Sequence, residues 1–245
     1  LIERAGAGGG TSAPQRLATA VGQQQVVHLA DGTQVVLGPG STLDVPAGYG
    51  GTARRVRLTG EAYFRAVHDA RRPFEVAAGD ALIRDLGTAF VVRAAGTPGQ
   101  PVDVAVTTGT VQLRATADSA APGPQHAGVL LRAGDRGRVL AATGAGAPST
   151  VAVVARGADV ASDTAWTTGH LVFRDAPLGE VAGALRRWYG LDLRFDDPAA
   201  ADRHLTATFS GESTAAVLHV IGLATGVRLE RRGDTVVVRE AAPSH

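Results

Sequence analysis

The segment Arg55-Val56-Arg57-Leu58-Thr59-Gly60-Glu61-Ala62-Tyr63-Phe64 decides the fold class of the larger part of this 245-residue chain. Val56 and Leu58 alternate with polar residues, and Ala62 and Phe64 continue the alternation. A period of two places one set of side chains on a single face of a half-buried strand. The segment therefore predicts two strands that are joined by a tight turn at Gly60-Glu61.

The same alternation recurs in short runs on both sides of this segment: Val35 and Leu37, Leu43 and Val45, Phe74 and Val76, Phe90 and Val92, Val102 to Val106, and Val111 and Leu113. Asp31-Gly32 and Thr108-Gly109 have the composition of hairpin turns. No helical period appears before about residue 155. Residues 21–156 are therefore predicted to form a mainly β domain, either a sandwich or a rolled, solenoid-like sheet.

The pattern changes after Trp166, where helical and strand-like segments alternate. Two helical faces are expected, one with Leu178, Val181, Ala182, Leu185, Trp188 and Tyr189, the other with Leu218, Ile221 and Ala224. Gly190 and Gly226 are typical helix ends. Residues 166–240 are therefore predicted to form a small α+β domain of two strand–helix–strand units. Residues 1–20 and 157–165 are expected to be linkers, and residues 241–245 a tail.

The charge balance excludes several functional classes. Lys and Arg number 24 against 23 Asp and Glu, a net charge of +1. This balance provides no field that attracts nucleic acid or an anionic membrane. The chain has no cysteine, which rules out disulfides and thiolate metal sites. Its longest uncharged run, Val139–Ala155, is broken by glycine and proline, so any membrane span is expected outside this sequence.

The residues that carry chemistry form no familiar catalytic pattern. No serine lies in a Gly-x-Ser-x-Gly motif, the histidines lack metal-ligand spacing, and the glycines form no phosphate-binding loop. His68-Asp69 comes nearest to a catalytic pair, but neighbouring residues of a strand point to opposite faces. We therefore expect no substrate turnover, no metal and no cofactor.

Many segments, in one order, resemble the FecR family of transmembrane regulators. Leu29 to Leu37, Arg55 to Phe64, Arg72 to Val76, Leu86 to Phe90 and Val104 to Gly109 are similar to the FecR domain. Trp166, Gly169, Leu171, Phe173 and Leu185 to Tyr189 resemble the family's C-terminal domain. That domain is similar to the short signalling domain of secretins and TonB-dependent receptors.

The resemblance implies a signal relay in the periplasm, within a single-pass inner-membrane protein. The signalling domain of a TonB-dependent outer-membrane receptor would engage this region. A cytoplasmic segment outside this sequence would control an extracytoplasmic-function sigma factor, in the uptake of iron or another nutrient. The alternative is an accessory β domain that binds or processes envelope glycan. An aromatic content of 4% argues against that alternative, because sugar platforms need Trp and Tyr.

Two sets of residues are candidates for function. Trp188 and Tyr189, of which one is expected in the core and one at the edge, and an expected edge strand at Val236, Val237 and Val238 would contact the partner. The resemblance also implies a candidate self-cleavage bond at Gly87-Thr88, because some FecR-like proteins cleave themselves at a Gly–Thr bond. A turn or bulge between strands is the alternative interpretation. No base for Thr88 is evident in the neighbouring sequence.

Overall fold

The structure of the protein is a computed structural model that describes residues 2–5, 13–94, 100–116, 128–140, 150–157 and 160–240. The chain divides into two compact units. Residues 1–20 and 24–164 form the first, here called the β domain, and residues 21–23 and 165–245 form the second, the C-terminal domain. Each domain is described by itself.

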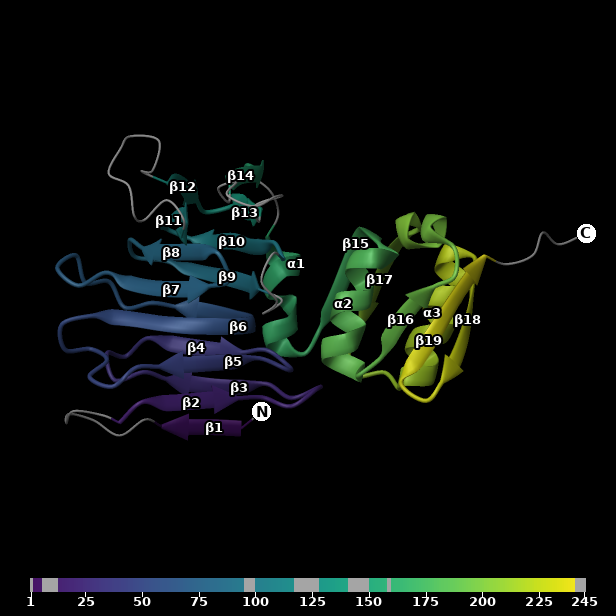
Figure 1. Ribbon diagram of the computed structural model, residues 1–245, viewed down its shortest axis with the longest axis horizontal. Helices are drawn as coiled ribbons and strands as arrows, with labels where there is room; N and C mark the ends of the chain where they lie inside the picture. Colours follow the sequence, from purple (N-terminus) through teal and green to yellow (C-terminus); the bar gives the residue numbers. More distant parts are fainter. Residues whose placement is uncertain are drawn as a thin grey trace, which may run out of the picture. The chain divides into compact units, whose positions relative to one another are not determined.

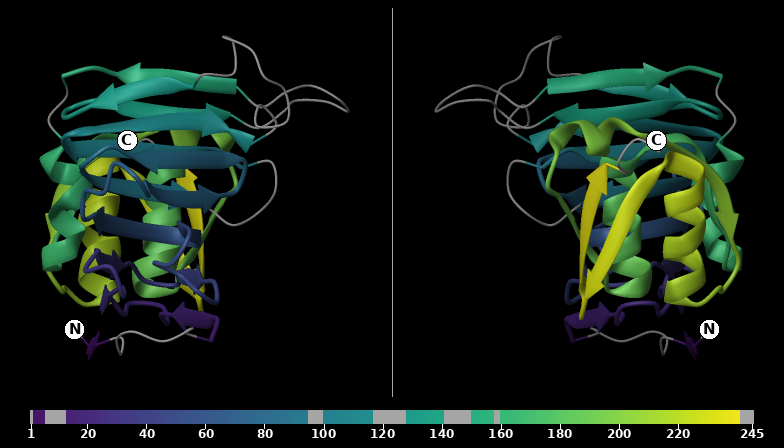
Figure 2. Two further views of the ribbon diagram at one scale, coloured as in Figure 1. Left: turned by 90° about the vertical axis from the view of Figure 1, so that its left-hand side faces the viewer. Right: turned by 90° about the vertical axis from the view of Figure 1, so that its right-hand side faces the viewer.

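The β domain is one 14-stranded sheet that is rolled into two layers (Figures 1 and 2). One layer contains β1 (Ile2–Ala5), β3 (Gln25–His28), β4 (Gln34–Leu37), β9 (Ala89–Ala94), β10 (Val102–Thr108), β13 (Arg136–Leu140) and β14 (Thr150–Ala155). The other contains β2 (Gln15–Ala18), β5 (Thr42–Val45), β7 (Phe74–Ala78), β8 (Ala81–Asp85), β11 (Thr110–Ala115) and β12 (Val129–Arg132). The prediction of a mainly β domain is confirmed, in its rolled form.

The strand β6 (Arg54–Arg65) joins the two layers and corrects the predicted turn at Gly60-Glu61. Its first half pairs with β5 and β7, and its second half pairs with β4 and β9. Gly60 has a positive φ of 98°, and a side chain there would collide with Ser41. The chain therefore bends at Gly60 from one layer into the other without reversing, and a single strand replaces the two that were predicted.

The glycine-containing corners of the roll differ in kind. Asp31-Gly32 joins β3 and β4, which pair with each other, so this predicted hairpin is confirmed. The prediction for Thr108-Gly109 is wrong, because β10 pairs with β9 and β13 while β11 pairs with β8 and β12. This corner carries the chain between layers, as Leu86 to Thr88 does between β8 and β9. A turn dipeptide alone does not distinguish a hairpin from such a crossing.

Both layers contribute inward side chains to one core. Phe64 stacks on Phe90 with their ring centroids 5.2 Å apart, and the ring of Phe74 lies 5.7 Å from that of Phe64. All three are fully buried, among a cluster of valine and leucine side chains from both layers. Burial of a large apolar side chain contributes about 1.5–3 kcal/mol to stability, so this core fixes the roll and positions its corners.

Both predicted linkers contain regular structure where they are described. Ile2–Ala5 pairs with β3 and Gln15–Ala18 pairs with β5, so the prediction of a flexible linker is wrong for these residues. Within 157–165, α1 (Ala161–Thr164) ends the β domain. Its Asp163 is held by Arg93 at 2.9 Å and by Arg136 at 2.8 Å, and Arg93 also contacts Glu61. The predicted tail, residues 241–245, lies outside the described residues.

The C-terminal domain has the small α+β fold that was predicted. The short 3-10 helix η3 (Ala165–Thr168) precedes β15 (Leu171–Pro177), α2 (Leu178–Tyr189), β16 (Asp192–Phe195), the 3-10 helix η4 (Pro198–Asp202), β17 (His204–Phe209), α3 (Thr214–Thr225), β18 (Val227–Arg232) and β19 (Thr235–Glu240). β15 pairs with β17, and β19 lies between β16 and β18. The Ser213 side chain caps α3, and left-handed glycines end both long helices, at Gly190 and Gly226.

The buried faces of the two helices differ in detail from the predicted ones. In α2 the buried residues are Leu178, Val181, Ala184 and Leu185. In α3 they are Val217, Ile221 and Thr225, so the predicted face is rotated, with Leu218 half-buried and Ala224 exposed. Apart from the two terminal threonines and the exposed His219, every residue of α3 is apolar or small, and a single polar residue between the ends is too little to predict the orientation of the helix. No helix in the described part of the chain is long and apolar enough to cross a membrane.

Candidate functional site

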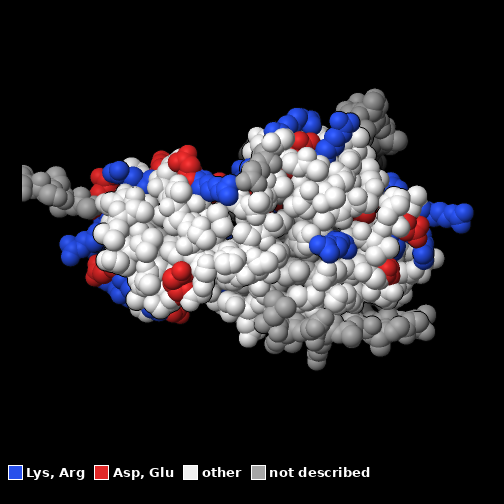
Figure 3. All heavy atoms as spheres, turned by 180° about the vertical axis from the view of Figure 1, so that it is seen from behind, with Lys and Arg blue, Asp and Glu red and all other residues white. Residues whose placement is uncertain are grey.

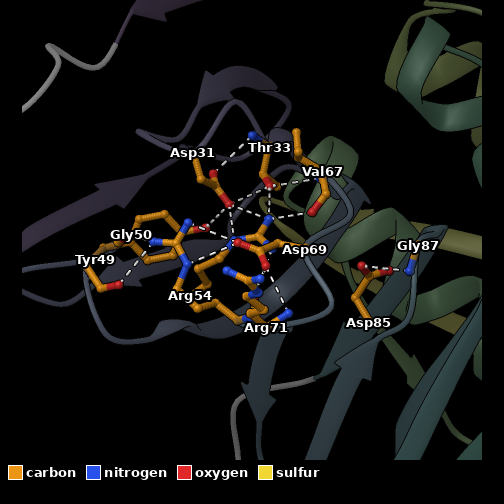
Figure 4. Close-up of polar contacts among 12 residues, drawn as sticks. Asp31, Thr33, Tyr49, Gly50, Arg54, Val67, Asp69, Arg71, Asp85 and Gly87 are labelled. Atoms are coloured by element: carbon orange, nitrogen blue, oxygen red, sulfur yellow. Dashed lines mark hydrogen bonds and ion pairs between the residues drawn. The ribbon is translucent and has the colours of Figure 1, made fainter.

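Loops gather at one end of the β domain around the buried side chain of Arg54, which is 2% exposed (Figure 4). Its guanidinium donates to the carboxylate of Asp31 at 2.6 Å and to the carbonyl oxygens of Val67 at 2.6 Å and Arg72 at 2.9 Å. It also lies 5.9 Å from the ring centroid of Phe74. A buried guanidinium is stable only when its donors are paired, and here they tie the loop of Asp31 to the loop that contains Val67 and Arg72.

Asp31 occupies the centre of this network. It accepts hydrogen bonds from the backbone N–H of Thr33 at 3.0 Å, from the hydroxyl of Thr33 at 2.9 Å and from the hydroxyl of Tyr49 at 2.9 Å. Burial alone would raise the pKa of this carboxyl, but the hydrogen bonds from Thr33, Arg54 and Tyr49 outweigh burial and lower the pKa. Asp31 therefore stays ionised, and burial raises the pKa of Tyr49 beside it.

A second aspartate corner contains the bond that was predicted as a cleavage candidate. The side chain of Asp85 accepts a hydrogen bond from the backbone N–H of Gly87 at 3.0 Å, and its other oxygen accepts one from the hydroxyl of Thr88. Asp85 is 3% exposed and Thr88 5% exposed. The statement that no base lies near Thr88 is therefore wrong. The turn brings the carboxylate of Asp85, three residues before Thr88, against the threonine hydroxyl, where it could act as a base.

The Asp85 carboxyl differs from that of Asp31 in its proton affinity. Burial raises its pKa to about 6, although the N–H of Gly87, the charge of Arg54, the N–H of Thr88 and the charge of His68 act in the opposite direction. In the described part of the chain no arginine forms an ion pair with Asp85. The carboxyl can therefore take up and release a proton near neutral pH.

The Gly87-Thr88 peptide bond is closely surrounded. Gly87 has a positive φ of 103°, which favours glycine, and the imidazole of His68 lies against it. A side chain at Gly109 would overlap the carbonyl oxygen of Gly87. Gly109 thus belongs to the site although it is 22 residues away in sequence, and only its small size could have indicated this. His68 belongs to a loop rather than a strand, and its neighbour Asp69 binds Arg72 at 2.9 Å.

The aromatic partner candidates lie at the end of α2. Trp188 and Tyr189 are both half-buried, so the expected division into one core and one edge residue is not observed. Burial and, after it, the charge of Glu212 raise the pKa of Tyr189. Both rings keep part of their surface open to a partner.

The prediction that Val236 to Val238 forms an edge strand is wrong. β19 is the central strand of its sheet, and Val237 lies opposite Arg194 on one side and Glu230 on the other. The side chains of Val236 and Val238 are fully buried, so neither is available to a partner. β16 is far from β19 in sequence and pairs with it in parallel, and a run of valines does not indicate such a pairing. A proline at Val237 would disrupt the sheet.

No metal site appears among the described residues, where no three His, Asp or Glu side chains converge.

Two crystal structures of a candidate anti-sigma factor from Parabacteroides distasonis ATCC 8503, at 1.65 and 2.50 Å resolution, have the same architecture. Their TM-scores are 0.76 and 0.75 at 25% identity, over 93% and 94% of this chain and 100% of theirs. A comparison with curated proteins gave no match.

Two family models match the sequence and define the class of protein. Residues 15–112 match the family described as FecR protein, and residues 170–238 match the family described as FecR, C-terminal. The first match covers most of the rolled β domain, and the second covers the α+β fold from β15 to β19. The chain belongs to the FecR family, as the resemblance predicted.

Proposed function

We propose that this chain is the periplasmic relay region of an anti-sigma regulator. In this proposal a TonB-dependent outer-membrane receptor signals to it through the receptor's own signalling domain. A membrane span and a cytoplasmic segment outside this sequence pass the signal to an extracytoplasmic-function sigma factor. The observation that carries the proposal is the pairing of a FecR domain with a FecR C-terminal domain in one chain, which is also similar in structure to a candidate anti-sigma factor.

The physical chemistry of the chain agrees with a binding role. The near-neutral charge of +1 does not select a nucleic acid or an anionic membrane. The buried Arg54 and the half-buried Asp31 are held by internal partners, which makes them part of the scaffold. Iron or another nutrient would be the transported ligand, sensed through the receptor.

The test is a binding measurement between two purified components. The chain is titrated by isothermal calorimetry with the isolated signalling domain of a TonB-dependent receptor from the same organism. We expect a dissociation constant of about 1 µM, or about 8 kcal/mol, as is usual for a transient signalling contact. The signalling domain of an unrelated receptor is the control, and equal binding or no binding to both would contradict the proposal.

We infer a second candidate function, self-cleavage between Gly87 and Thr88, from the hydrogen bond between Thr88 and Asp85. Asp85 would take the proton from the hydroxyl of Thr88 while the hydroxyl oxygen of Thr88 attacks the carbonyl carbon of Gly87. The proton would then pass to the nitrogen of Thr88 as the C–N bond breaks, leaving an ester. Water would open this ester to a Gly87 carboxylate and a free amine and hydroxyl on Thr88.

Intact mass spectrometry under denaturing conditions tests this second function. Cleavage predicts fragments 1–87 and 88–245 from the wild type and a single chain from Thr88→Ala. Thr88→Ser should retain some cleavage, and Asp85→Asn should slow it strongly. The native protein should stay together after cleavage, because β9 and β11 from one fragment pair with β6 and β8 from the other. An uncut wild type after long incubation at pH 8 would leave Gly87-Thr88 as a structural corner.

A further inference from the structure

The corner between β8 and β9 has a buried side and an exposed side, and the two sides carry different titratable groups. Asp85 and Thr88 lie on the buried side, and Figure 4 shows the Asp85 carboxylate turned toward the N–H of Gly87. His68 and Leu86 are exposed, Leu86 by 46%, and Gly87 is half-buried. Solvent therefore reaches this corner from the side of His68.

The imidazole of His68 approaches the main chain closely because Gly87 has no side chain. A Cβ added at Gly87 would lie 3.1 Å from Nδ1 and 3.5 Å from Cγ of His68. Nδ1 is therefore no more than about 6 Å from the carbonyl carbon of Gly87, because two covalent bonds of about 1.5 Å separate that carbon from a Cβ. One water spans such a distance, since it donates to a base at about 2.6–3.2 Å and attacks a carbonyl carbon from about 3–3.5 Å.

The ring nitrogens of His68 are open to water. In the described part of the chain no hydrogen bond or ion pair engages this side chain, whereas the exposed His204 binds Asp175 at 2.8 Å. Nδ1 accepts a hydrogen bond when the ring carries its proton on Nε2. The nitrogen nearest Gly87 is therefore available to a water molecule.

Two neighbouring carboxylates are already engaged. Asp69, next to His68, binds the guanidinium of Arg72 at 2.9 Å. Both oxygens of Asp85 accept hydrogen bonds, one from a backbone N–H and one from the hydroxyl of Thr88. Asp85 therefore faces the hydroxyl that would attack first, while His68 faces the solvent from which water would come.

The reaction at this corner requires water and no other co-reactant. Basic and acidic side chains are interspersed on the face of the molecule seen in Figure 3, and the net charge is +1. Such a surface has no field that concentrates a charged ligand. Cleavage within the chain agrees with this, because the nucleophile and the carbonyl both belong to the chain and water is uncharged.

We propose that self-cleavage at Gly87-Thr88 uses two bases in turn, and that His68 is the catalytic base of the second step. This proposal rests on the self-cleavage proposed above, in which Asp85 serves the first step. The first step moves the acyl group of Gly87 to the hydroxyl oxygen of Thr88. A water molecule then gives a proton to Nδ1 of His68 while its oxygen bonds to the carbonyl carbon of Gly87.

The ester bond breaks as the second step is completed. The bond between the carbonyl carbon of Gly87 and the oxygen of Thr88 is cleaved, and the imidazolium of His68 returns the proton to that oxygen. The new carboxyl group of Gly87 gives its own proton to the free amine of Thr88. One water is consumed, and His68 ends in the state in which it began.

Hydroxylamine separates the two steps, because it attacks an ester without the help of a base. The native protein is incubated at pH 7 with and without hydroxylamine, denatured in acid and measured by intact mass spectrometry. Opening by hydroxylamine leaves fragment 1–87 with a hydroxamate in place of a carboxylate, and mass distinguishes the two. The reagent also cuts Asn–Gly bonds, but the chain contains no Asn.

We expect His68→Ala to slow cleavage by water at least tenfold, since a general base contributes about 10²–10⁴-fold. Hydroxylamine should restore cleavage of His68→Ala to about the rate of wild type treated in the same way. Asp85→Asn should cleave slowly in both conditions, because its ester forms slowly. His219→Ala is the matched control, because His219 is exposed but lies on α3 of the C-terminal domain, and this variant should cleave as the wild type does.

The contrary outcomes separate this proposal from self-cleavage itself. Cleavage of His68→Ala by water at the wild-type rate would overturn the role of His68 alone, as would a wild type that is cut only in hydroxylamine. Slow cleavage of His68→Ala in hydroxylamine would show that His68 supports the corner and is not its base. A wild type that stays whole in both conditions would overturn self-cleavage as well. Circular dichroism of each variant confirms its fold, which an exposed substitution should preserve.

Discussion

The β domain contains one kind of aspartate–glycine–threonine corner twice, and the two corners differ in what holds the carboxylate. Asp31 accepts hydrogen bonds from the N–H and hydroxyl of Thr33, and Asp85 accepts them from the N–H of Gly87 and the hydroxyl of Thr88. Only Asp31 is also paired with the guanidinium of Arg54. The hydrogen-bonding pattern is shared, and the direct contact with a guanidinium is not.

This difference separates a structural corner from one that can carry out proton transfer. The backbone N–H of Thr33 and the guanidinium of Arg54, 2.6 Å away, together keep Asp31 ionised, so its carboxylate only positions the loop. Asp85 is buried without an ion pair in the described part of the chain, so the same contact with a threonine hydroxyl can move a proton. The capacity for proton transfer therefore depends on the aspartate, on the threonine and on whether an arginine forms an ion pair with the aspartate.

The largest expected effect comes from removing the guanidinium of the first corner. Arg54→Ala leaves Asp31, whose side chain is only 11% exposed, without its cation, which should lower the free energy of unfolding by about 3–5 kcal/mol. Arg55→Ala is the control, because its pair with Glu75 is exposed and contributes under about 1 kcal/mol. Urea unfolding followed by circular dichroism measures both losses. Tryptophan fluorescence is not suitable, because Trp166 and Trp188 both lie in the C-terminal domain. Equal losses in the two variants would contradict the structural role of Arg54.

The stability of the second corner, at Gly87-Thr88, should fall more when an added side chain crowds it than when a charge is removed from it. Gly109→Ala puts a Cβ on the carbonyl oxygen of Gly87 and should cost about 2–4 kcal/mol, from overlap and from a positive φ of 78°. Gly50→Ala is matched in φ, at 85°, but its Cβ meets nothing within 4 Å, so it should cost about 1 kcal/mol. Thermal unfolding of the two variants gives the comparison, and similar stability of both would show that the corner can relax.

The sequence predicted the elements of this fold better than their connections. Alternating residues such as Val56 and Leu58 are sufficient for strands, because the period of two depends only on which face is buried. The layer to which a strand belongs depends on pairing between distant segments, so the hairpin at Thr108-Gly109 and the edge at Val236–Val238 were wrong. Asp85 was missed as a base because the turn that folds it onto Thr88 is a three-dimensional feature, although the similar Asp31-Gly32-Thr33 indicated the pattern.

The smallest expected effect is the pH dependence of stability. The pKa of Asp85 in the folded state, about 6, lies above its unfolded value of about 4, so the folded state binds more protons between these pH values. Its contribution to stability should fall as pH rises from 4 to 6, by roughly 1–2 kcal/mol after allowance for residual solvation. Asp31 has the opposite sign, because its lowered pKa adds stability above pH 4 that is lost as the pH falls.

This dependence is measured as the difference between two urea-unfolding series from pH 4 to pH 7. Wild type minus Asp85→Asn isolates the Asp85 contribution, because the other carboxyl groups are common to both proteins. A difference that stays constant with pH would show that folding does not raise the pKa of Asp85.

The most direct test of the contrast between the corners is a carbon-13 NMR titration of the two aspartate carboxyl groups in one sample. Asp85→Asn and Asp31→Asn assign the two signals. The structure predicts a midpoint of about 6 for Asp85 and a midpoint for Asp31 below its ordinary value of about 3.9. Two midpoints below pH 4 would show that both corners are purely structural and would remove Asp85 as a base for Thr88.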